Sequence, residues 1–379
     1  MKIAIFTGNY NHIRDGVSLT LNRLVEFLEG EGEEVLVFGP TVDEPAFQHN
    51  GTLIPVPSIA MPGRPEYRIS TRFPKPARRT LEEFGPDLIQ ISTPDVLGYH
   101  ALLWARRNRV PVVSSYHTHF TSYLKYYNLN FLESFGWSYM RWFYGHSSQI
   151  FVPTRSMWEE LEEKGIKGDF RIWARGVDTV LFNPARRDND WRSRYGFDQE
   201  DVIISYVSRL VWEKNPDIFA HTIQKLEKKY PAVKPMIVGE GPALDGLKEL
   251  LPEATYSGFL TGVELADAYA NSDIFLFPSD TESFGNVTLE AMASGLPCVV
   301  ADATGSKSLV DDRVNGYLVS VSRPDKFVEA VEHLVKDSQL RKQMGSRSVE
   351  KAGNYTWDQI NQQLLSNYRE AIQSLESGS

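Results

Sequence analysis

Short apolar runs alternate with longer amphipathic segments along most of the 379-residue chain. Residues 2–8 are mostly apolar, residues 18–32 repeat apolar positions every three or four residues, and a second apolar run follows at 34–40. The first and third runs are typical of buried strands, and the second is typical of a helix that covers one face of a sheet. The pattern recurs, so we expect further strands in the first half at 87–93, 110–117 and 149–154.

A polar segment at residues 182–201 separates this series from a second one. Two strand-helix series predict two doubly wound, Rossmann-like α/β domains, each with a parallel sheet covered on both faces. We place the first domain at 1–187 and the second at 198–356, with a helix at about 357–379 that packs back on the first. Ligands of such sheets bind at the carboxyl ends of the strands, so we expect the site in a cleft between the domains. The second series of strands is expected at 202–210, 234–241, 254–260, 273–279 and 296–302.

Length and composition are those of a cytoplasmic globular protein. The chain is too long for one ordinary core, and no apolar run is long enough to span a bilayer or to suggest a signal peptide. The single cysteine, Cys298, rules out an internal disulfide. It lies in an apolar run, which favours core packing over a role as a nucleophile.

The charge of the chain is acidic overall but uneven. The formal net charge is −9, with 21 basic and 22 acidic residues in 1–190 against 19 and 27 in 191–379. An acidic chain argues against nucleic acid as a partner. The near-neutral half nevertheless contains a basic stretch at 63–79 that could meet an anionic surface. Its cations are Arg64, Arg68, Arg72, Lys75, Arg78 and Arg79.

Two places in the first half could bind a ligand. Gly16 precedes a predicted helix, where a glycine lets backbone N–H groups approach a phosphate, although a plain N-cap at Ser18 explains the same pattern. His117 and His119 lie at the end of a predicted strand. They could be exposed loop histidines or part of a metal site, but no third ligand stands nearby, and we favour a contact with a substrate.

The second half offers cations and carboxylates at strand ends. Arg209 and Lys214 would suit a diphosphate, or they could be solvated surface cations. Glu282 falls in a predicted loop and Glu290 in the helix that follows. Glu290 has apolar neighbours, and a carboxylate buried among them needs hydroxyl partners. The start of this helix, where free N–H groups attract phosphate, holds Phe284, Gly285, Asn286 and Val287.

Together these motifs resemble glycosyltransferase family 4, the retaining enzymes of the GT-B fold. The resemblance extends over nearly the whole chain and is carried by VSRLVWEKN at 207–215, IVGEGP at 237–242 and the segment 257–302, in which Glu282 and Glu290 are eight positions apart. The segment ARGVDTVLFNP at 174–184 matches the end of the family's first domain. Trp212 and Asn215 are not the residues that are typical of the family at these positions of the first motif.

The resemblance implies a role for each candidate residue. Glu282 faces the donor sugar, Glu290 holds the ribose hydroxyls, and Arg209 and Lys214 grip the diphosphate. His117 matches a histidine near the reacting centre. The remaining implied contacts are backbone N–H groups of Phe284, Gly285, Asn286 and Val287 to the sugar and phosphate, Gly16 to the donor phosphate, and Arg175 and His119 as candidate contacts to the sugar or acceptor.

The implied reaction breaks the bond between a sugar and a nucleoside diphosphate of UDP or GDP. Negative charge grows on the leaving diphosphate, and Arg209, Lys214 and helix N-termini can stabilise it, so we expect neither a metal ion nor a cofactor. Front-face attack would retain the anomeric configuration without an enzymatic nucleophile. A sugar-nucleotide epimerase, a phosphorylase with pyridoxal phosphate and a non-catalytic sugar-binding module remain as weaker alternatives.

The first domain most resembles enzymes that glycosylate membrane lipids, such as bacterial sulfoquinovosyl-diacylglycerol synthases and mannosyl- or glucuronosyl-lipid transferases. The likeness lies in residues 8–24 and 92–127. Independently, residues 120–145 are rich in aromatic side chains beside Lys125 and Arg141, which suits a membrane interface or a buried helix pair. We therefore predict transfer of a hexose or hexuronate to a lipid hydroxyl at the anionic cytoplasmic face of a membrane, with Trp137 or Trp142 inserted. A soluble or polysaccharide-precursor acceptor is the alternative.

Overall fold

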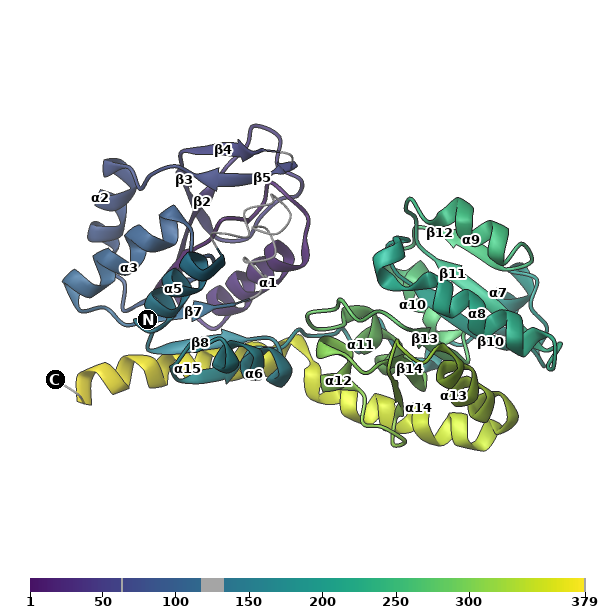
Figure 1. Ribbon diagram of the computed structural model, residues 1–379. Coiled ribbons are helices and arrows are strands. Elements are labelled where there is room, and N and C mark those ends of the chain that lie inside the picture. The colour runs from purple at the N-terminus through teal and green to yellow at the C-terminus, as the bar shows by residue number, and fades with distance from the viewer. Residues whose placement is uncertain (63, 117–132, 378–379) are drawn as a thin grey trace. The chain divides into compact units, whose positions relative to one another are not determined.

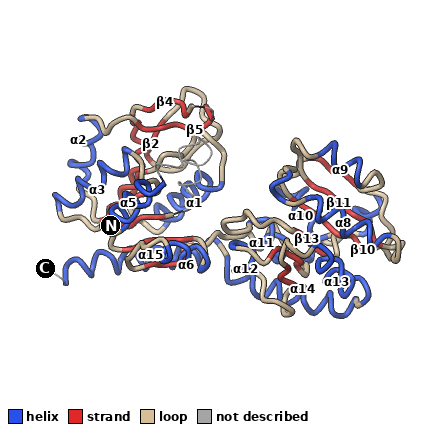
Figure 2. Tube along the Cα trace, viewed as in Figure 1, coloured by secondary structure: helices blue, strands red, loops and turns tan. Residues whose placement is uncertain are grey.

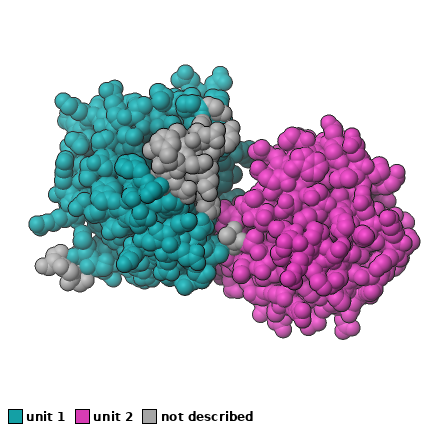
Figure 3. Space-filling model, in the orientation of Figure 1, with its two compact units in different colours: residues 1–174, 360–379 teal, residues 175–359 magenta. Residues whose placement is uncertain are grey.

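The computed structural model describes residues 1–379 except residue 63, residues 117–132 and residues 378–379. The chain forms two compact units (Figure 3). Unit 1 comprises Met1–Ala174 and Ile360–Ser379, and unit 2 comprises Arg175–Gln359. The division after Ala174 lies before residue 187, where the sequence analysis ends the first domain, so the segment 175–187 belongs to unit 2.

Unit 1 is built on a parallel sheet of seven strands in the order β3-β2-β1-β6-β7-β8-β9. Figure 1 labels β2, β3, β7 and β8 of this sheet. An antiparallel hairpin, β4 (Ser58–Met61) and β5 (Arg64–Ser70), forms a separate small sheet. The strands of the large sheet are β1 (Lys2–Phe6), β2 (Glu34–Pro40), β3 (Thr52–Val56), β6 (Leu88–Ile91), β7 (Val112–Ser115), β8 (Gln149–Val152) and β9 (Phe170–Ile172).

Alternate residues of the unit 1 strands supply two separate cores. In β1, Ala4 and Phe6 belong to one hydrophobic cluster, whereas Ile3 and Ile5 belong to the other. Side chains of successive strand residues point to opposite faces, so the sheet is covered on both sides, as expected of a doubly wound fold. The first face is covered by α2 (Lys75–Phe84), α3 (Val96–Asn108), α5 (Glu133–Tyr144) and α6 (Arg155–Glu163), and the second by α1 (Gly16–Gly30) and α15 (Trp357–Ser377).

Unit 2 repeats the plan with a parallel sheet in the order β12-β11-β10-β13-β14-β15. Figure 2 shows its strands in red and its helices in blue. Its strands are β10 (Val202–Val207), β11 (Val233–Val238), β12 (Thr255–Gly258), β13 (Ile274–Phe277), β14 (Cys298–Ala301) and β15 (Gly316–Val319). The first five confirm the predicted series, and β15 is a four-residue edge strand that the sequence pattern did not reveal. The helices are α7 (Asn189–Arg194), α8 (Pro216–Glu227), α9 (Leu244–Leu250), α10 (Gly262–Ala270), α11 (Asn286–Ala293), α12 (Thr304–Leu309), α13 (Pro324–Lys336) and α14 (Ser338–Ala352).

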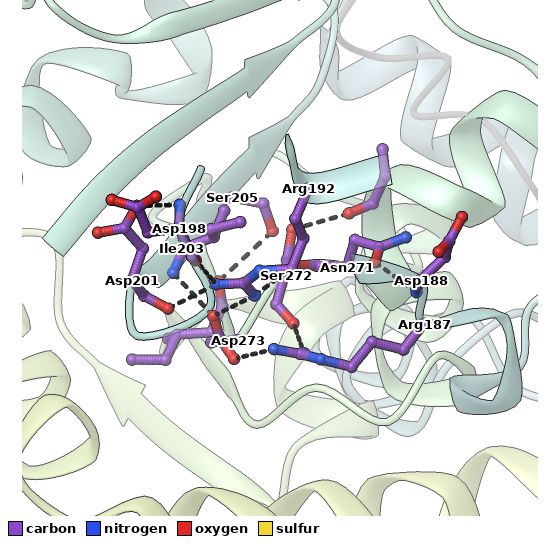
Figure 4. A network of polar contacts seen from close by, with 12 residues as sticks. Arg187, Asp188, Arg192, Asp198, Asp201, Ile203, Ser205, Asn271, Ser272 and Asp273 are labelled. Atoms are coloured by element: carbon purple, nitrogen blue, oxygen red, sulfur yellow. Dashed lines mark hydrogen bonds and ion pairs between the residues drawn. The ribbon is translucent and has the colours of Figure 1, made fainter. Parts of the chain in front are cut away.

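The polar segment 182–201 folds onto unit 2 around a buried arginine (Figure 4). Arg192 is 1% exposed and donates to Asp273 Oδ2 over 3.1 Å. It also donates to the carbonyl oxygens of Asn271, Asp198 and Asp201 over 3.1, 3.0 and 2.6 Å. These four acceptors replace the water that the guanidinium loses on burial. The polarity of the segment therefore reflects a buried network rather than an extended linker.

Each sheet has one place where the chain changes direction across the strand order. In unit 1 the change lies between β1 and β6, and in unit 2 it lies between β10 and β13. Loops that leave the carboxyl ends of two such strands diverge and open a crevice, which is the usual ligand position in open α/β sheets. In unit 2 the two loops are those that contain Lys214 and Glu282.

Candidate active site

The loop after β10 and the loop after β13 meet through one cation and one carboxylate. Lys214 Nζ donates to Glu282 Oε1 over 2.6 Å and to Thr281 Oγ1 over 3.0 Å. The side chain of Lys214 is 18% exposed and that of Glu282 is 21% exposed, so solvent reaches both. An ammonium group has three N–H donors, so Lys214 can keep both contacts and still donate to a phosphate oxygen. The structure thus joins two groups that the sequence analysis assigned separately to diphosphate and sugar.

The backbone around Lys214 is fixed by the residue that follows it. Asn215 has a φ of 53°, in the left-handed region that asparagine tolerates better than most residues. Its Nδ2 donates to the carbonyl oxygen of Pro278 over 2.9 Å and to Asp280 Oδ1 over 3.1 Å. In addition, the hydroxyl of Tyr206 donates to the carbonyl oxygen of Lys214 over 3.3 Å. The bonds of Asn215 join the loop of Lys214 to the loop that carries Glu282, and the bond of Tyr206 joins it to β10.

Two glycines bring a third loop against the one that carries Arg209. Gly239 and Gly241 have φ values of 132° and 154°. A Cβ at Gly239 would lie 1.9 Å from the carbonyl oxygen of Ser208, and one at Gly241 would lie 2.3 Å from that of Leu210. Only glycine permits this approach of backbone to backbone. The contact fixes the loop from which the exposed side chain of Arg209 projects.

The start of α11 presents backbone N–H groups beside Glu282. Gly285 turns the chain with a φ of 99°, and the helix begins at Asn286 without a side-chain cap. Its first N–H groups therefore lack intrahelical acceptors. Gly305 N donates to the carbonyl oxygen of Glu282 over 3.0 Å, and a Cβ at Gly305 would lie 2.7 Å from the backbone of Phe284. The ring of Phe284 is buried, so its backbone is what this residue can offer to a ligand.

Glu290 lies further along α11 and is oriented by a tyrosine. The hydroxyl of Tyr269, on α10, donates to Glu290 Oε2 over 3.3 Å. Burial, and then the charge of Glu290, raise the pKa of Tyr269 well above its ordinary value, so this hydroxyl remains a donor. Glu290 itself is half-buried, which leaves it partly open to solvent. Tyr269 could not be linked to Glu290 from the sequence, because it lies on α10 and not on α11.

In unit 1, Gly16 is the first residue of α1 and is exposed. A Cβ added there would meet no other atom within 4 Å, so the space around Gly16 is open. The alternative interpretation, an N-cap at Ser18, is wrong. The N-cap is Asp15, whose Oδ1 accepts from Ser18 N and Ser18 Oγ, both over 2.8 Å.

A buried carboxylate that the sequence analysis did not single out lies near the change of direction in the unit 1 sheet. Asp95 follows β6, caps α3 and accepts from Gly98 N over 2.8 Å. Thr93, which also follows β6, accepts from Gly8 N of the loop after β1 over 2.9 Å. Burial raises the pKa of Asp95 to about 6, against the opposing effect of the N–H groups at the helix start.

The remaining candidates from the sequence are not part of the group around Lys214 and Glu282 in the described residues. His117 and His119 lie outside the described residues. Arg175 is buried within unit 2. Cys298 is fully buried on β14 and burial raises the pKa of its thiol, which agrees with core packing. Within the described part of the chain, no three His, Cys, Asp or Glu side chains are grouped as metal ligands would be.

Two family models match the chain in succession. Glycosyltransferase Family 4 matches residues 14–181, and Glycosyl transferases group 1 matches residues 187–351. The chain is 31% identical to a GDP-mannose-dependent alpha-mannosyltransferase of Mycobacterium tuberculosis, over 97% of this chain and 96% of that protein. It is 25% identical to an alpha-monoglucosyldiacylglycerol synthase of Streptococcus pneumoniae, over 84% of this chain and 75% of that protein.

Solved structures agree on the fold. Anabaena HepE in complex with UDP has a TM-score of 0.77 with this chain at 20% identity, covering 98% of this chain and 100% of that one. At this identity the similarity concerns the fold alone, which is GT-B with two Rossmann-like halves. Both parts of the expected resemblance, to the family and to its lipid glycosyltransferases, are confirmed. This chain belongs to glycosyltransferase family 4.

Proposed function

We propose that this protein is a retaining glycosyltransferase that moves a hexose or hexuronate from a UDP- or GDP-sugar to a hydroxyl of a membrane lipid. The contact between Lys214 and Glu282 carries the proposal, because it holds a cation for the leaving diphosphate beside a carboxylate for the sugar. Two relatives support the substrate classes, since one is named for GDP-mannose and the other for diacylglycerol.

The reaction exchanges one bond at the anomeric carbon for another. The bond to the diphosphate oxygen breaks, and its electron pair leaves on the diphosphate. The acceptor oxygen forms the new bond on the same face of the sugar, and its proton passes to the departing phosphate oxygen. Lys214 and Arg209 stabilise the negative charge as it grows, which lowers the barrier more than it strengthens ground-state binding.

The donor is held by groups on the loops and on α11. Glu282 faces the sugar and keeps the amine of Lys214 in position. Glu290, oriented by Tyr269, accepts hydrogen bonds from the ribose hydroxyls. The N–H groups at the start of α11 and the open backbone at Gly16 approach the phosphates, and His117 orients the acceptor or contacts the sugar. Arg175 and His119 are further candidate contacts.

We propose that the protein needs neither a metal ion nor a cofactor. Lys214, Arg209 and the start of α11 offer two full positive charges and the positive end of a helix dipole to the diphosphate. Glu282 offsets part of the charge of Lys214, and the guanidinium of Arg209 and the start of α11 supply the rest of the positive potential. Activity should therefore survive EDTA, and activity lost to EDTA and restored by magnesium or manganese would refute this part of the proposal.

Fewer cations are available to bind an anionic membrane than the sequence suggested. Three of the six cations in the basic stretch already have partners in unit 1. Arg64 pairs with Glu66 at 3.0 Å, and Arg79 pairs with Glu83 at 2.7 Å. Arg68 donates to Ser58 Oγ over 2.8 Å. The remaining three, Arg72, Lys75 and Arg78, are exposed and have no ion-pair partner among the described residues.

The apolar part of the docking surface also differs from the expectation. Trp137 is 7% exposed and belongs to the unit 1 core, and Trp142 packs against that core, so Trp137 cannot insert into a membrane. Ile59 of β4 is 55% exposed instead. The hairpin that carries Ile59 closes at a hydrogen bond from Thr71 N to the carbonyl oxygen of Pro57, and Arg72 follows directly. We propose that Ile59 and the three exposed cations form the docking surface.

Three cations near an anionic surface contribute about 1 kcal/mol each, which allows reversible docking. In the described part of the chain, no helix is both long enough and apolar enough to span a bilayer. We propose that the protein binds the cytoplasmic face of a membrane peripherally, through charge and one apolar side chain. This attraction should weaken as added salt screens it.

A transfer assay tests the proposed function. Radiolabelled UDP- and GDP-sugars are incubated with the protein and with anionic vesicles that contain or lack diacylglycerol. Label that enters the lipid phase only when diacylglycerol is present supports the proposal. A labelled glycoside that stays in the water phase would show that the acceptor is a soluble molecule. An epimerised donor sugar without any transfer would refute glycosyl transfer.

A further inference from the structure

A cavity of ≈ 400 Å³ lies in unit 2 at the amino-terminal ends of two strands. Its wall includes Ser272 and Asp273, which directly precede β13, and Gly295, Leu296 and Pro297, which directly precede β14. Glu282 lies beyond the opposite, carboxyl end of β13. The cavity is therefore separated by the length of a strand from the groups that we assign to the donor.

The rest of the wall is cationic. Arg187, from the segment before α7, and Arg341 and Lys342, from the first turn of α14, line the cavity together with Ser338. Asp273 is the single carboxylate in the wall. It is already shared, because its Oδ1 pairs with Arg187 at 2.8 Å and its Oδ2 pairs with the buried Arg192 at 3.1 Å (Figure 4).

The positive charge of this wall exceeds its negative charge. The wall residues carry three cations and one anion, an excess of two positive charges. Arg192, which pairs with Asp273, and Asp337, whose charge acts on Arg341, add one charge of each sign and leave this excess unchanged. Burial lowers the pKa of Arg341 most, the carboxylate of Asp273 opposes this, and the guanidinium of Arg187 lowers the pKa by a smaller amount, which reflects repulsion between the two guanidinium groups. An anion between them would relieve this repulsion.

The cations are also held in place with donors to spare. Arg341 Nη1 donates to the carbonyl oxygens of Leu334 and Val335 over 2.6 and 3.1 Å, at the end of α13. These bonds fix the guanidinium plane. Among the described residues, Nε and Nη2 of Arg341 and Nζ of Lys342 have no acceptor. A fixed guanidinium fork beside an ammonium matches the geometry of phosphate oxygens.

We infer that this cavity is a second anion site, separate from the donor site, that binds a small phosphate-bearing ligand through Arg187, Arg341 and Lys342. The volume is within the range of small-molecule pockets and exceeds what one phosphate group needs, so a diphosphate or a phosphorylated metabolite fits better than a single inorganic ion. Every group involved belongs to unit 2, and the inference does not depend on the acceptor or on the chemistry of transfer.

Hydrogen exchange measured by mass spectrometry, with pyrophosphate as the probe, locates this site without an activity readout. Pyrophosphate should slow exchange in residues 185–192 and 338–345. The donor site also attracts diphosphate, so the same titration is run on Lys214→Ala. Protection near residues 208–215 and 280–290 should weaken in that variant, whereas protection at the second site should persist.

Substitutions in the wall provide the decisive comparison. Lys342→Gln is exposed and should fold normally, and Arg341→Gln removes the fork; together they should weaken pyrophosphate protection at 338–345 at least tenfold. Arg347→Gln, an exposed position on the same helix outside the wall, is the matched control and should bind as the wild type does. Absence of protection at 338–345, or protection unchanged in Lys342→Gln and in the double variant, would overturn the inference.

Anionic vesicles of phosphatidylglycerol distinguish a free phosphate ligand from a lipid head group. Protection of 338–345 by pyrophosphate but not by vesicles assigns the site to a soluble ligand. Protection by vesicles alone, lost in Lys342→Gln, would overturn the soluble ligand that we infer and assign the cations to a lipid head group.

Discussion

Replacement of Lys214 by alanine removes one ammonium group from the point where unit 2 should meet the leaving diphosphate. Its Nζ lies 2.6 Å from Glu282 Oε1 and 3.0 Å from Thr281 Oγ1, with one N–H donor left for a phosphate oxygen. Loss of one preorganised donor to a developing negative charge typically costs about 2.7–4 kcal/mol, or about 10²–10³ in kcat. We therefore expect Lys214→Ala to lower kcat by that factor, and kcat/KM at least as much.

The folded state should tolerate this change. Both partners of the ion pair are partly exposed to solvent, so its loss should cost about 1 kcal/mol of unfolding free energy or less. Thermal unfolding and steady-state kinetics on one preparation separate the two effects. Lys229→Ala is the matched control, because it removes a lysine of the same unit that pairs with Glu332 on the surface at 3.5 Å.

The result that refutes this reasoning is a folded Lys214→Ala protein with kcat within threefold of the wild type. A raised KM with unchanged kcat would also count against it, because that pattern means that the lysine binds the ground state and the transition state equally. A double-mutant cycle with Glu282→Gln adds a second check. Direct coupling through the 2.6 Å contact predicts that the two losses are not additive.

Four further predictions follow from contacts in the two units. Glu290→Gln should weaken nucleotide binding by about 1.5–3 kcal/mol in calorimetry, because the ribose would lose charge-assisted hydrogen bonds; equal affinity would remove Glu290 from the site. Replacing Arg72, Lys75 and Arg78 with glutamine should lower binding to anionic vesicles by about 3 kcal/mol in sedimentation, whereas Arg79→Gln, already paired with Glu83, should change it less. Arg192→Ala should destabilise unit 2 by about 3–5 kcal/mol in urea, because it removes one of the two guanidinium partners of Asp273 and the donor to three carbonyl groups; a loss under 1 kcal/mol would contradict its role. Burial raises the pKa of Asp95 from about 3.9 in the unfolded chain to about 6 in the folded protein, so its contribution to the free energy of unfolding is complete below pH 3.9 and is lost as pH rises through 6. Asp95→Asn should therefore remove about 3 kcal/mol of the pH dependence of this free energy. An unchanged dependence of stability on pH would argue against this prediction.

The strand-helix pattern was sufficient to predict the fold and the loops that hold the candidate site residues. Arg209, Lys214 and Glu282 all follow apolar strands, and the carboxyl ends of parallel strands share one edge of a sheet. Periodicity does not reveal which strands are neighbours. The adjacency of β10 and β13, which places Lys214 against a carboxylate far along the chain, therefore became known only from the structure.

Other features escaped sequence reasoning for different physical reasons. Asn215 and Trp212 are atypical residues for the motif at 207–215. Asn215 adopts a left-handed conformation, and its side chain donates a hydrogen bond to the loop after β13. The ring of Trp212 packs against Gly246, where an added Cβ would lie only 2.7 Å from the ring. The polar segment 182–201 does not reveal the role of Arg192, because composition does not show that four protein oxygens surround its guanidinium. The sequence left residues 120–145 open between a membrane interface and a buried helix pair, because an aromatic-rich helix has the same composition in both, and the structure places Trp137 in the core.

The most direct test of the central claim is the anomeric configuration of the glycolipid formed from a nucleotide sugar and diacylglycerol vesicles. NMR of the purified product gives this configuration from the one-bond coupling constant between the anomeric carbon and its proton. The account predicts a lipid glycoside with the same anomeric configuration as the donor, formed in the presence of EDTA and reduced about 10²–10³-fold by Lys214→Ala. A product of inverted configuration, or release of free sugar with no glycolipid in any donor series, would contradict it.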